Sequence, residues 1–385
     1  MAFRARVVDR IADIDAQAWN EAAAACGEPY NPFVDHRFLV ALEESGSVGA
    51  GTGWAPAHIV LEDEDGRPAG FAPCYLKSHS RGEYVFDQGF ADAYERAGGS
   101  YYPKLQVSAP FTPATGPRLL PAPGFDRDAA EGGLVAALRG LMRQTRTSSV
   151  HVTFATDRQR ALLVSEGFLP RDDQQFHWRN EGYGSYDDFL ASLASRKRKQ
   201  LKRERRDALA NGITIRHATG ADLREADWDA FFAFYMDTGS RKWGRPYLTR
   251  RFFSLVGEAM PEAILLVIAE RDGRPIAGAL NFIGGDALFG RYWGAVEDHP
   301  FLHFEVCYHQ AIDAAIARGL ARVEAGAQGE HKLARGYRPV VTRSAHLFAD
   351  PGLARAVADY LKRERAYVAE AQTELEAATP FRRGS

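Results

Sequence analysis

The chain carries the same four residues twice, each time in the same place within a longer pattern. Asp-Gly-Arg-Pro stands at residues 65–68 and again at 272–275, and both copies join two apolar runs. Two further pairs of similar segments keep the same order: 13–19 with 222–228, and 31–39 with 245–253. The paired landmarks are roughly 207 to 214 residues apart, as small loop insertions would produce. This repetition predicts that one fold of about half the chain is used twice.

Composition indicates a globular protein with room for two cores, because the 385 residues are 45% hydrophobic and 25% charged. The amino-terminal residues lack the apolar stretch of a signal peptide, and no run approaches the roughly 18 apolar residues of a membrane span. We therefore expect a cytoplasmic protein. Three scattered cysteines without a CxxC spacing predict no structural metal.

Hydrophobic periodicity predicts the same order of elements in both halves: strand, two helices, antiparallel meander, helix, strand and helix. Asp-Gly between apolar runs predicts a tight hairpin turn in each half. This order indicates a mixed α/β fold with a mainly antiparallel sheet covered by helices in each half. It resembles the element order of the GNAT acyltransferase fold, which implies two GNAT-like domains in tandem. A glycine-containing break at 181–185 predicts the boundary between a first domain, 1–180, and a second domain, 181–385. We expect the second domain to be the catalytic one.

A densely basic segment, 196–206, opens the second half. It is either a solvated helix or an anion-binding helix that meets phosphates of tRNA, of a diphosphate-linked lipid precursor or of a membrane surface. The candidate anion-binding residues are Arg196, Lys197, Lys199 and Arg203.

Three segments, 30–33, 303–308 and 327–337, resemble the bacterial FemAB-like predicted N-acyltransferases of the GNAT superfamily. Proteins of that family are associated with peptidoglycan biosynthesis or recognition. The resemblance implies transfer of an acyl or aminoacyl group to an amine, for which the amine of a peptidoglycan precursor is one candidate. Its implied donor is acyl-CoA or aminoacyl-tRNA, with no metal.

The segment 328–335 concentrates polar side chains after a predicted strand, where binding sites often lie. Acyl transfer to an amine needs a base for the amine proton and donors for the oxyanion. Glu330 or His331 could be the base, while Gln328, Lys332 and Arg335 could bind a phosphate or carboxylate of the substrate. The alternative is a surface loop with local ion pairs.

A second candidate region begins a helix predicted from 302 to 318, whose apolar face is expected to be buried. His303 and Glu305 are candidate catalytic residues. Glu305 and His309, one turn apart, could form a base and its orienting partner or a plain helical ion pair. Cys307 falls on the apolar face and is typical of a core residue.

Further candidate substrate-binding residues lie near strand ends and long loops in both halves. In the second half they border the expected acyl cleft, and in the first half they lie in the corresponding loop region; in both places ordinary packing is the alternative. They are Arg291, Tyr292 and Trp293, and Asp87, Tyr102 and Lys104.

One expected motif is missing. GNAT proteins that use acyl-CoA cradle its pyrophosphate on a glycine-rich turn before a helix, whereas acidic residues occupy 296–300 here. Two alternatives to the main interpretation therefore stay open. One is an acyl-CoA-dependent small-molecule N-acetyltransferase, and the other is a non-catalytic protein that binds a cell-wall precursor or an anionic lipid.

Overall fold

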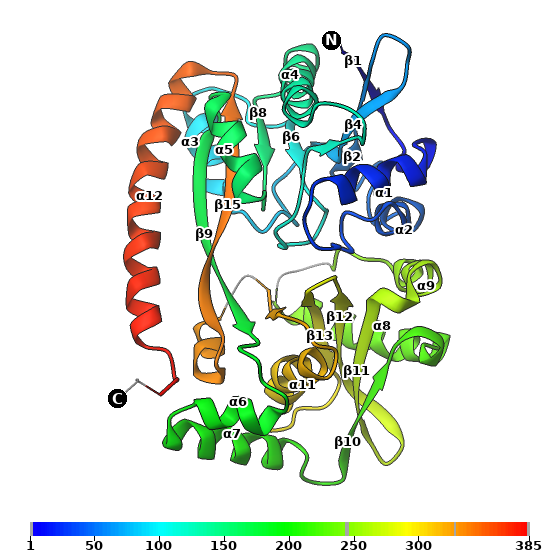
Figure 1. Cartoon of the computed structure of the whole chain (residues 1–385), viewed down its shortest axis with the longest axis vertical. Coiled ribbons are helices and arrows are strands. Elements are labelled where there is room, and N and C mark those ends of the chain that lie inside the picture. The colour runs from blue at the N-terminus through cyan, green and yellow to red at the C-terminus, as the bar shows by residue number, and fades with distance from the viewer. Residues whose placement is uncertain (1–2, 243–245, 327–328, 383–385) are drawn as a thin grey trace. The chain divides into compact units, whose positions relative to one another are not determined.

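The chain forms two compact units of mixed α/β structure (Figure 1). A computed structural model describes residues 3–242, 246–326 and 329–382; of residues 240–242 and 330 it describes the backbone only. Unit 1 contains residues 1–173 and 341–370, and unit 2 contains residues 174–340 and 371–385.

Unit 1 contains the elements of the first repeat. They are β1 (Arg4–Val8), η1 (Ile11–Asp13), α1 (Ala16–Ala25), α2 (His36–Glu44), β2 (Trp54–Pro56), β3 (His58–Glu62), β4 (Pro68–Ala72), β5 (Cys74–Lys77), α3 (Gln88–Arg96), β6 (Lys104–Val107), β7 (Leu120–Pro121), α4 (Arg127–Thr145), β8 (Ser149–Val152) and α5 (Asp157–Ser165). One sheet has the order β1-β3-β4-β7, and β8, β6, β5 and β2 lie side by side in another.

Unit 2 repeats this order after two additional helices. Its elements are α6 (Tyr186–Ser192), α7 (Ser195–Ala208), β10 (Ile213–Ala218), η2 (Gly220–Asp222), α8 (Glu225–Lys242), α9 (Arg250–Ala259), η3 (Pro261–Ala263), β11 (Ile264–Arg271), β12 (Arg274–Ile283), β13 (Ala287–Ala295), α10 (Leu302–Phe304), the π-helical turn η4 (Glu305–His309), α11 (Gln310–Ala317), β14 (Arg322–Glu324) and η5 (Glu330–Arg335). The predicted element order and basic helix are confirmed.

The last strand of each repeat completes the sheet of the other unit. These strands are β9 (Leu169–Arg179) and β15 (Arg338–Phe348); α12 (Pro351–Ala377) follows β15. Residues 177–179 of β9 pair antiparallel with β14, whereas residues 345–348 of β15 pair antiparallel with β8. The two sequence repeats therefore exchange their last strands, since residues 177–179 belong to unit 2 and residues 345–348 to unit 1. The boundary near residue 180 stays a prediction about where the duplicated sequences meet.

Both Asp-Gly turns connect antiparallel hairpins, as their residue types predict. The first joins β3 to β4 and the second joins β11 to β12. Gly66 and Gly273 have φ angles of 79° and 72°, a left-handed conformation that glycine adopts without a steric penalty. Local turn chemistry therefore accounts for this part of the repeat.

The main core of unit 2 lies between its sheet and the helical segment 302–317. Val306, Ala311 and Ile312 are fully buried there against strand residues such as Leu265 and Leu288, which confirms the predicted apolar face. The core of unit 1 packs α4 and α5 against strands in the same way, through Leu134, Leu138, Leu163, Val150 and Val152.

Two features were not expected from the sequence. The segment 89–124, predicted to be rich in loops, contains most of helix α3 and the short strands β6 and β7. The opposite face of the helical segment 302–317 is also covered, because Glu305 and His309 are 0% exposed and α6 and α7 pack against α11 and η4. Charged residues at helical spacing gave no indication of this second layer.

Candidate active site

Strands β13 and β14 part within unit 2 and leave a pocket between them. They pair in parallel only from Ala287 to Phe289, because β14 ends at Glu324 while β13 continues to Ala295. On its other side, β13 carries a bulge: Leu280 pairs with Tyr292 and Asn281 with Gly290, so that Arg291 is an extra residue. A pocket of about 160 Å³ opens where the two strands part.

This pocket brings together candidates from two predicted regions. Arg291, Tyr292 and Trp293 of β13 line it together with His303 of α10. Cys307 and Tyr308 of η4 complete that wall, so that Cys307 borders the pocket as well as the core.

A second pocket of about 530 Å³ adjoins the first, because Trp293 and His303 line both. Three carboxylates line this larger pocket: Asp237, Glu297 and Asp298. Glu297 is paired with Arg271 at 2.9 Å and with His299 at 2.8 Å, whereas Asp298 is exposed. Before α10, the charge of Glu297 is therefore compensated by Arg271, and Asp298 is the exposed carboxylate.

His331 reaches the first pocket through a neighbouring phenol. Its Nε2 atom lies 2.9 Å from the Oη atom of Tyr308, and its ring centroid is 6.2 Å from that of His303. Burial raises the pKa of Tyr308, so that the phenol stays protonated at neutral pH. His331 itself is exposed to solvent. The pair can therefore pass a proton between the pocket and solvent.

Lys332 and Arg335 lie inside the structure. Lys332 is 2% exposed, and its Nζ atom donates to the carbonyl oxygen of Gly326 at 2.9 Å. Burial lowers the pKa of Lys332 to about 8, and the charge of Arg291 acts in the same direction. Arg335 donates to Glu204 at 2.8 Å and lies over the ring of Phe304. Arg335 therefore holds η5 against α7, while its substrate-binding role stays a prediction.

Glu305 and His309 have separate partners. The Glu305 carboxylate accepts hydrogen bonds from Arg205 at 2.9–3.2 Å and from Gln310 at 2.6 Å. The Nδ1 atom of His309 lies 2.6 Å from the Oη atom of Tyr186, and burial holds the pKa of His309 well below its usual value. The predicted pairing of these two residues, as base and orienting partner or as an ion pair, is therefore wrong. A catalytic role of Glu305 stays a prediction.

Two residues of the predicted loop cannot be placed in this way. Gln328 lies outside the described residues, and of Glu330 only the backbone of η5 is described. Their substrate-binding and catalytic roles stay predictions.

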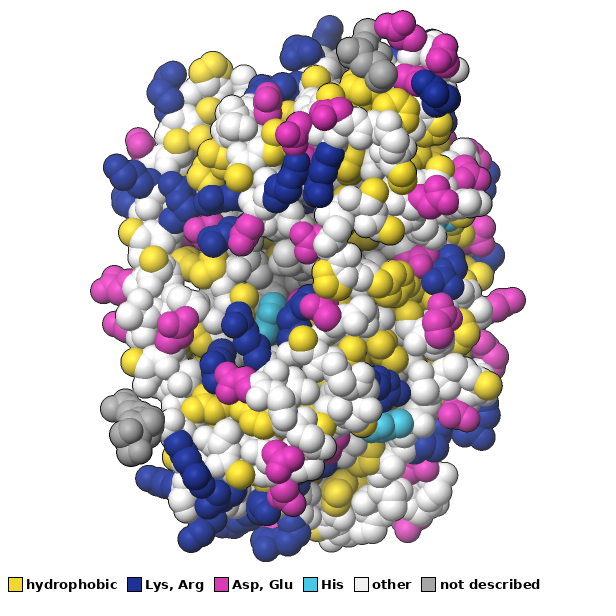
Figure 2. Space-filling model, viewed as in Figure 1, with side chains coloured by type: hydrophobic (Ala, Val, Ile, Leu, Met, Phe, Trp, Pro, Cys, Tyr) yellow, Lys and Arg dark blue, Asp and Glu magenta, His cyan; other side chains and the backbone are white. Residues whose placement is uncertain are grey.

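Helix α7 presents basic side chains on its outer face, where Figure 2 shows Lys and Arg gathered at the lower left. Arg196, Lys199 and Arg203 are exposed and Lys197 is half-buried. Arg203 is paired with Asp207 at 3.2 Å. The inner face carries Glu204 and Arg205, which bind Arg335 and Glu305. We call the outward set of exposed cations the basic stripe: Arg196, Lys199, Lys202, Arg203 and Arg206.

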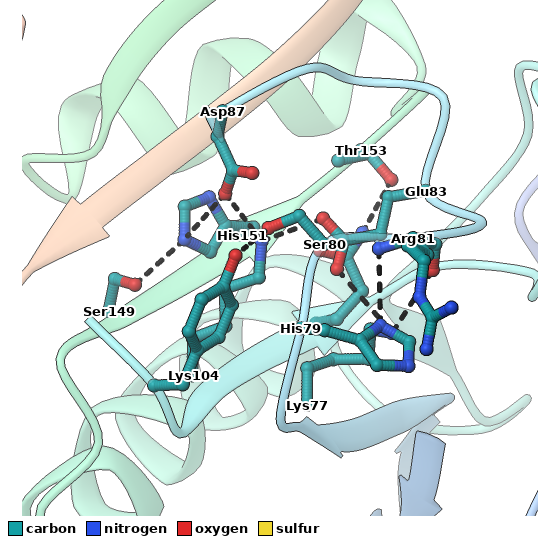
Figure 3. Close-up of polar contacts among 12 residues, drawn as sticks. Lys77, His79, Ser80, Arg81, Glu83, Asp87, Lys104, Ser149, His151 and Thr153 are labelled. Carbon is teal, nitrogen blue, oxygen red and sulfur yellow. Dashed lines mark hydrogen bonds and ion pairs between the residues drawn. The ribbon is translucent and has the colours of Figure 1, made fainter. Parts of the chain in front are cut away.

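The three candidates of the first half meet in a largely buried cluster of unit 1, of which Figure 3 labels Asp87 and Lys104. The Nζ atom of Lys104, which is fully buried, donates to Glu83 at 2.7 Å, to Asp87 and to Ser80 at 2.9 Å. The hydroxyl of Ser80 lies 2.8 Å from that of Tyr102. Although burial opposes it, the two carboxylates raise the pKa of Lys104.

Sequence reasoning missed other members of this cluster. Lys77 is fully buried with its Nζ atom 3.7 Å from the centroid of the Trp54 ring, and burial lowers the pKa of Lys77 to about 7. The Nδ1 atoms of His151 and His346 lie 2.6 Å apart, and burial lowers the pKa of both. The sequence signal that could have found this cluster is a lysine at the end of an apolar strand, which is the position of Lys77.

The described residues contain no group of three or more side chains suited to hold a metal ion. Nor does any described helix combine the length and apolar character that crossing a bilayer requires.

Comparison with solved structures shows the same fold in proteins of low identity. FemX is similar with a TM-score of 0.56 and 12% identity, over 90% of this chain and 98% of that chain. L-PGS from Bacillus licheniformis has a TM-score of 0.51 and 9% identity, over 88% and 98%. The carboxy-terminal domain of a putative lysylphosphatidylglycerol synthetase from Agrobacterium fabrum has a TM-score of 0.53 and 8% identity, over 90% and 96%.

No curated protein sequence matches this chain. A family model does: residues 10–383 match that of the FemAB-like proteins, described as peptidoglycan biosynthesis/recognition. The match spans both repeats and agrees with the resemblance of the three segments noted above. The chain therefore belongs to the FemAB-like family.

Proposed function

We propose that unit 2 transfers an acyl or aminoacyl group to an amine, with the acyl donor in the pocket where β13 and β14 part. The observation that carries this proposal is the early end of their parallel pairing, which leaves a lined pocket at the centre of the sheet. Membership of the FemAB-like family supports a transferase of this general class.

Starting from the neutral amine, the reaction requires two proton transfers; an amine that arrives as an ammonium ion first loses one more proton to solvent or to the base. The amine nitrogen attacks the acyl carbonyl carbon, a C–N bond forms, and the C–O or C–S bond to the donor breaks. The amine loses a proton and the leaving group gains one. We assign the base to His331, reached through the Tyr308 hydroxyl, because Tyr308 lines the pocket and its hydroxyl lies 2.9 Å from the imidazole.

Positive charge beside the pocket suits a donor with an anionic group. Arg291 lines the pocket, and Lys332 is partly protonated near pH 8. These cations would also favour the negative charge that develops on the carbonyl oxygen. Arg335 acts in this proposal as a positioning residue, since it holds the turn that carries His331.

The charges around the pockets favour aminoacyl-tRNA over acyl-CoA as the donor. Glu297 and Asp298 precede α10, where a pyrophosphate would need exposed amides and positive potential. The basic stripe of α7 instead offers several exposed cations to a phosphate backbone. The acidic pocket beside Trp293 suits an acceptor amine, which arrives as an ammonium ion, for example on a peptidoglycan precursor.

The test is a transfer assay with the purified chain. Acetyl-CoA or charged tRNA would be offered with a peptidoglycan-precursor amine, and product would be detected by mass spectrometry. We expect transfer by the wild-type chain and loss of transfer in His331→Ala with an unchanged circular dichroism spectrum. Transfer at the wild-type rate in His331→Ala would remove that residue from the mechanism. Absence of transfer from both donors, with precursor binding retained, would favour a binding protein.

A further inference from the structure

The helical segment beside the pocket contains a π-helical turn, η4. In this turn the backbone N–H group of Gln310 donates to the carbonyl oxygen of Glu305, five residues earlier instead of four. The helix at the same place in the first repeat, α4, is a continuous α-helix. Turns of the π type are rare and are often found at functional sites. Here the turn carries Cys307 and Tyr308, which line the pocket, so its geometry determines where the phenol of Tyr308 lies.

The two helices that precede the second repeat hold both ends of this turn. Arg205 of α7 makes a bidentate contact with Glu305, in which Nε lies 3.1 Å from Oε2 and Nη2 lies 2.9 Å from Oε1. A bidentate contact fixes the orientation of the carboxylate as well as its position. At the other end, the hydroxyl of Tyr186 in α6 lies 2.6 Å from Nδ1 of His309. Because Glu305 and His309 are 0% exposed, water does not compete for these contacts.

The neighbouring residue of α7 reaches the other segment of the site. Glu204 accepts a hydrogen bond from Nη2 of Arg335 at 2.8 Å, and Nη1 of Arg335 donates to the carbonyl oxygen of His331 at 2.9 Å. Glu204 and Arg335 are each 5% exposed. Two consecutive residues of one helix therefore hold η4, which carries Tyr308, and η5, which carries His331.

The contact between Tyr308 and His331 depends on where these two segments lie. Its length is 2.9 Å, within the narrow range of a hydrogen bond, and its atoms belong to residues 23 positions apart in the sequence. A displacement of either segment by about 1 Å would break the hydrogen bond, and a misplacement of that size can cost about 10²-fold in rate. Buried ion pairs add little net stability, but their fixed geometry suits such support.

Glu305 itself is remote from the reacting groups. A base must come within hydrogen-bond reach of the proton that it takes. The Glu305 carboxylate accepts hydrogen bonds from Arg205 and, at 2.6 Å, from Gln310. It is not one of the described residues that line either pocket of unit 2. Its effect on the reaction would therefore pass through the turn that it begins.

We infer that Glu204 and the ion pair of Arg205 with Glu305 are positioning groups, which hold Tyr308 and His331 at the distance that lets a proton pass between them. The inference rests on the proposed function for the use of this contact in transfer. The contact itself is observable in the resting chain without any substrate.

The test observes the Nε2 signal of His331 by ¹⁵N NMR in the full chain labelled at histidine. His331→Ala assigns this signal by its loss, and Tyr308→Phe gives its position without the phenol. We expect the signal to shift toward that position in Glu305→Gln, because an amide NH₂ group replaces an oxygen that accepts from Arg205. Glu204→Met should shift it in the same direction, since methionine offers Arg335 no oxygen acceptor.

Asp227→Asn is the matched control. Asp227 is also a buried carboxylate of unit 2, 3% exposed, and it accepts from Arg216 at 2.6 Å, but it lines neither pocket. The control should leave the His331 signal and the transfer kinetics unchanged. In the transfer assay Glu305→Gln should lower kcat about 10²-fold with KM for both substrates unchanged, the pattern of a misplaced catalytic group.

An unshifted His331 signal in Glu305→Gln or in Glu204→Met would overturn the inference for that residue. An equal shift in Asp227→Asn, or a loss of kcat without a shift, would overturn it altogether. If a carboxylate variant does not fold, as judged by circular dichroism, Arg335→Lys takes its place, because it keeps the charge and loses the bidentate geometry. A shift in a chain that transfers nothing from either donor would refute the proposed function and leave the support of this contact by α7 standing.

Discussion

The two units use the same element order, yet they differ at the place where the site is proposed. In unit 1, β6 ends at Val107, where its parallel pairing with β8 also ends. In unit 2, β13 continues from Gly290 to Ala295 after its pairing with β14 has ended. In unit 1, β6 does not continue past its pairing with β8. In unit 2, the part of β13 that continues past its pairing with β14 borders a pocket. The open strand edge that borders the proposed site of unit 2 is therefore not repeated between β6 and β8 of unit 1.

Their charged groups differ in the same way. Unit 1 buries Lys104 between the carboxylates of Glu83 and Asp87. In unit 2 the Nζ atom of the buried Lys332 instead donates to the backbone carbonyl oxygen of Gly326. Removing a lysine that has two buried carboxylate partners is expected to cost more stability than removing one that is bonded to a backbone carbonyl.

The largest expected effect is on catalysis by unit 2. His331→Ala should lower the transfer rate about 10²–10⁴-fold, because an acyl transfer without its base loses that much. His217→Ala is the control, since His217 is exposed and is not one of the residues that line the pocket. Its Nε2 atom lies 2.8 Å from the Oε1 atom of Gln310. Steady-state kinetics measure both variants, and equal rates would break the assignment of the base to His331.

The next effect is on the stability of unit 1. Lys104→Met should lower the free energy of unfolding by about 3–5 kcal/mol, because it leaves Glu83 and Asp87 buried with insufficient positive charge. Lys332→Met, at the buried lysine of unit 2, should cost only about 1 kcal/mol, since its Nζ atom bonds one backbone carbonyl. Urea denaturation gives both values. Equal losses would contradict the contrast between the units.

A smaller effect is the pH dependence contributed by Lys77. Burial lowers its pKa in the folded chain to about 7, whereas that of an unfolded lysine is about 10.4. Between these values the unfolded chain binds more protons, so the contribution of Lys77 to the free energy of unfolding rises with pH and is lost toward pH 7. Lys77→Met should remove this slope, as measured by urea denaturation between pH 7 and about pH 10. A slope identical to that of the wild-type chain would show that Lys77 remains charged.

The smallest expected effect concerns the charge that unit 2 exposes. Arg196→Gln combined with Lys199→Gln should reduce the salt dependence of tRNA binding by about two phosphate contacts. The free energy of unfolding should change by less than about 0.5 kcal/mol, because both side chains are exposed. Fluorescence anisotropy over a range of salt concentrations measures the slope. An unchanged slope would exclude these two cations from the tRNA contact.

Local chemistry made much of the fold predictable. The Asp-Gly hairpins, the basic helix and the apolar face of residues 302–318 all follow from residue types at short spacing. The candidate pocket was predictable in part, since Arg291, Tyr292, Trp293 and His303 were named and share it. The Tyr308 contact of His331 was not, because it joins residues of different elements.

The sequence by itself determined the duplication, the order of elements in each repeat and the family, because these depend on patterns along the chain. Only the tertiary structure decided that the last strand of each repeat completes the sheet of the other unit. It also decided that Glu305 binds Arg205 and that Lys104 binds Asp87. Such pairings depend on burial and on distances between remote segments, which the spacing of residues along the chain does not contain.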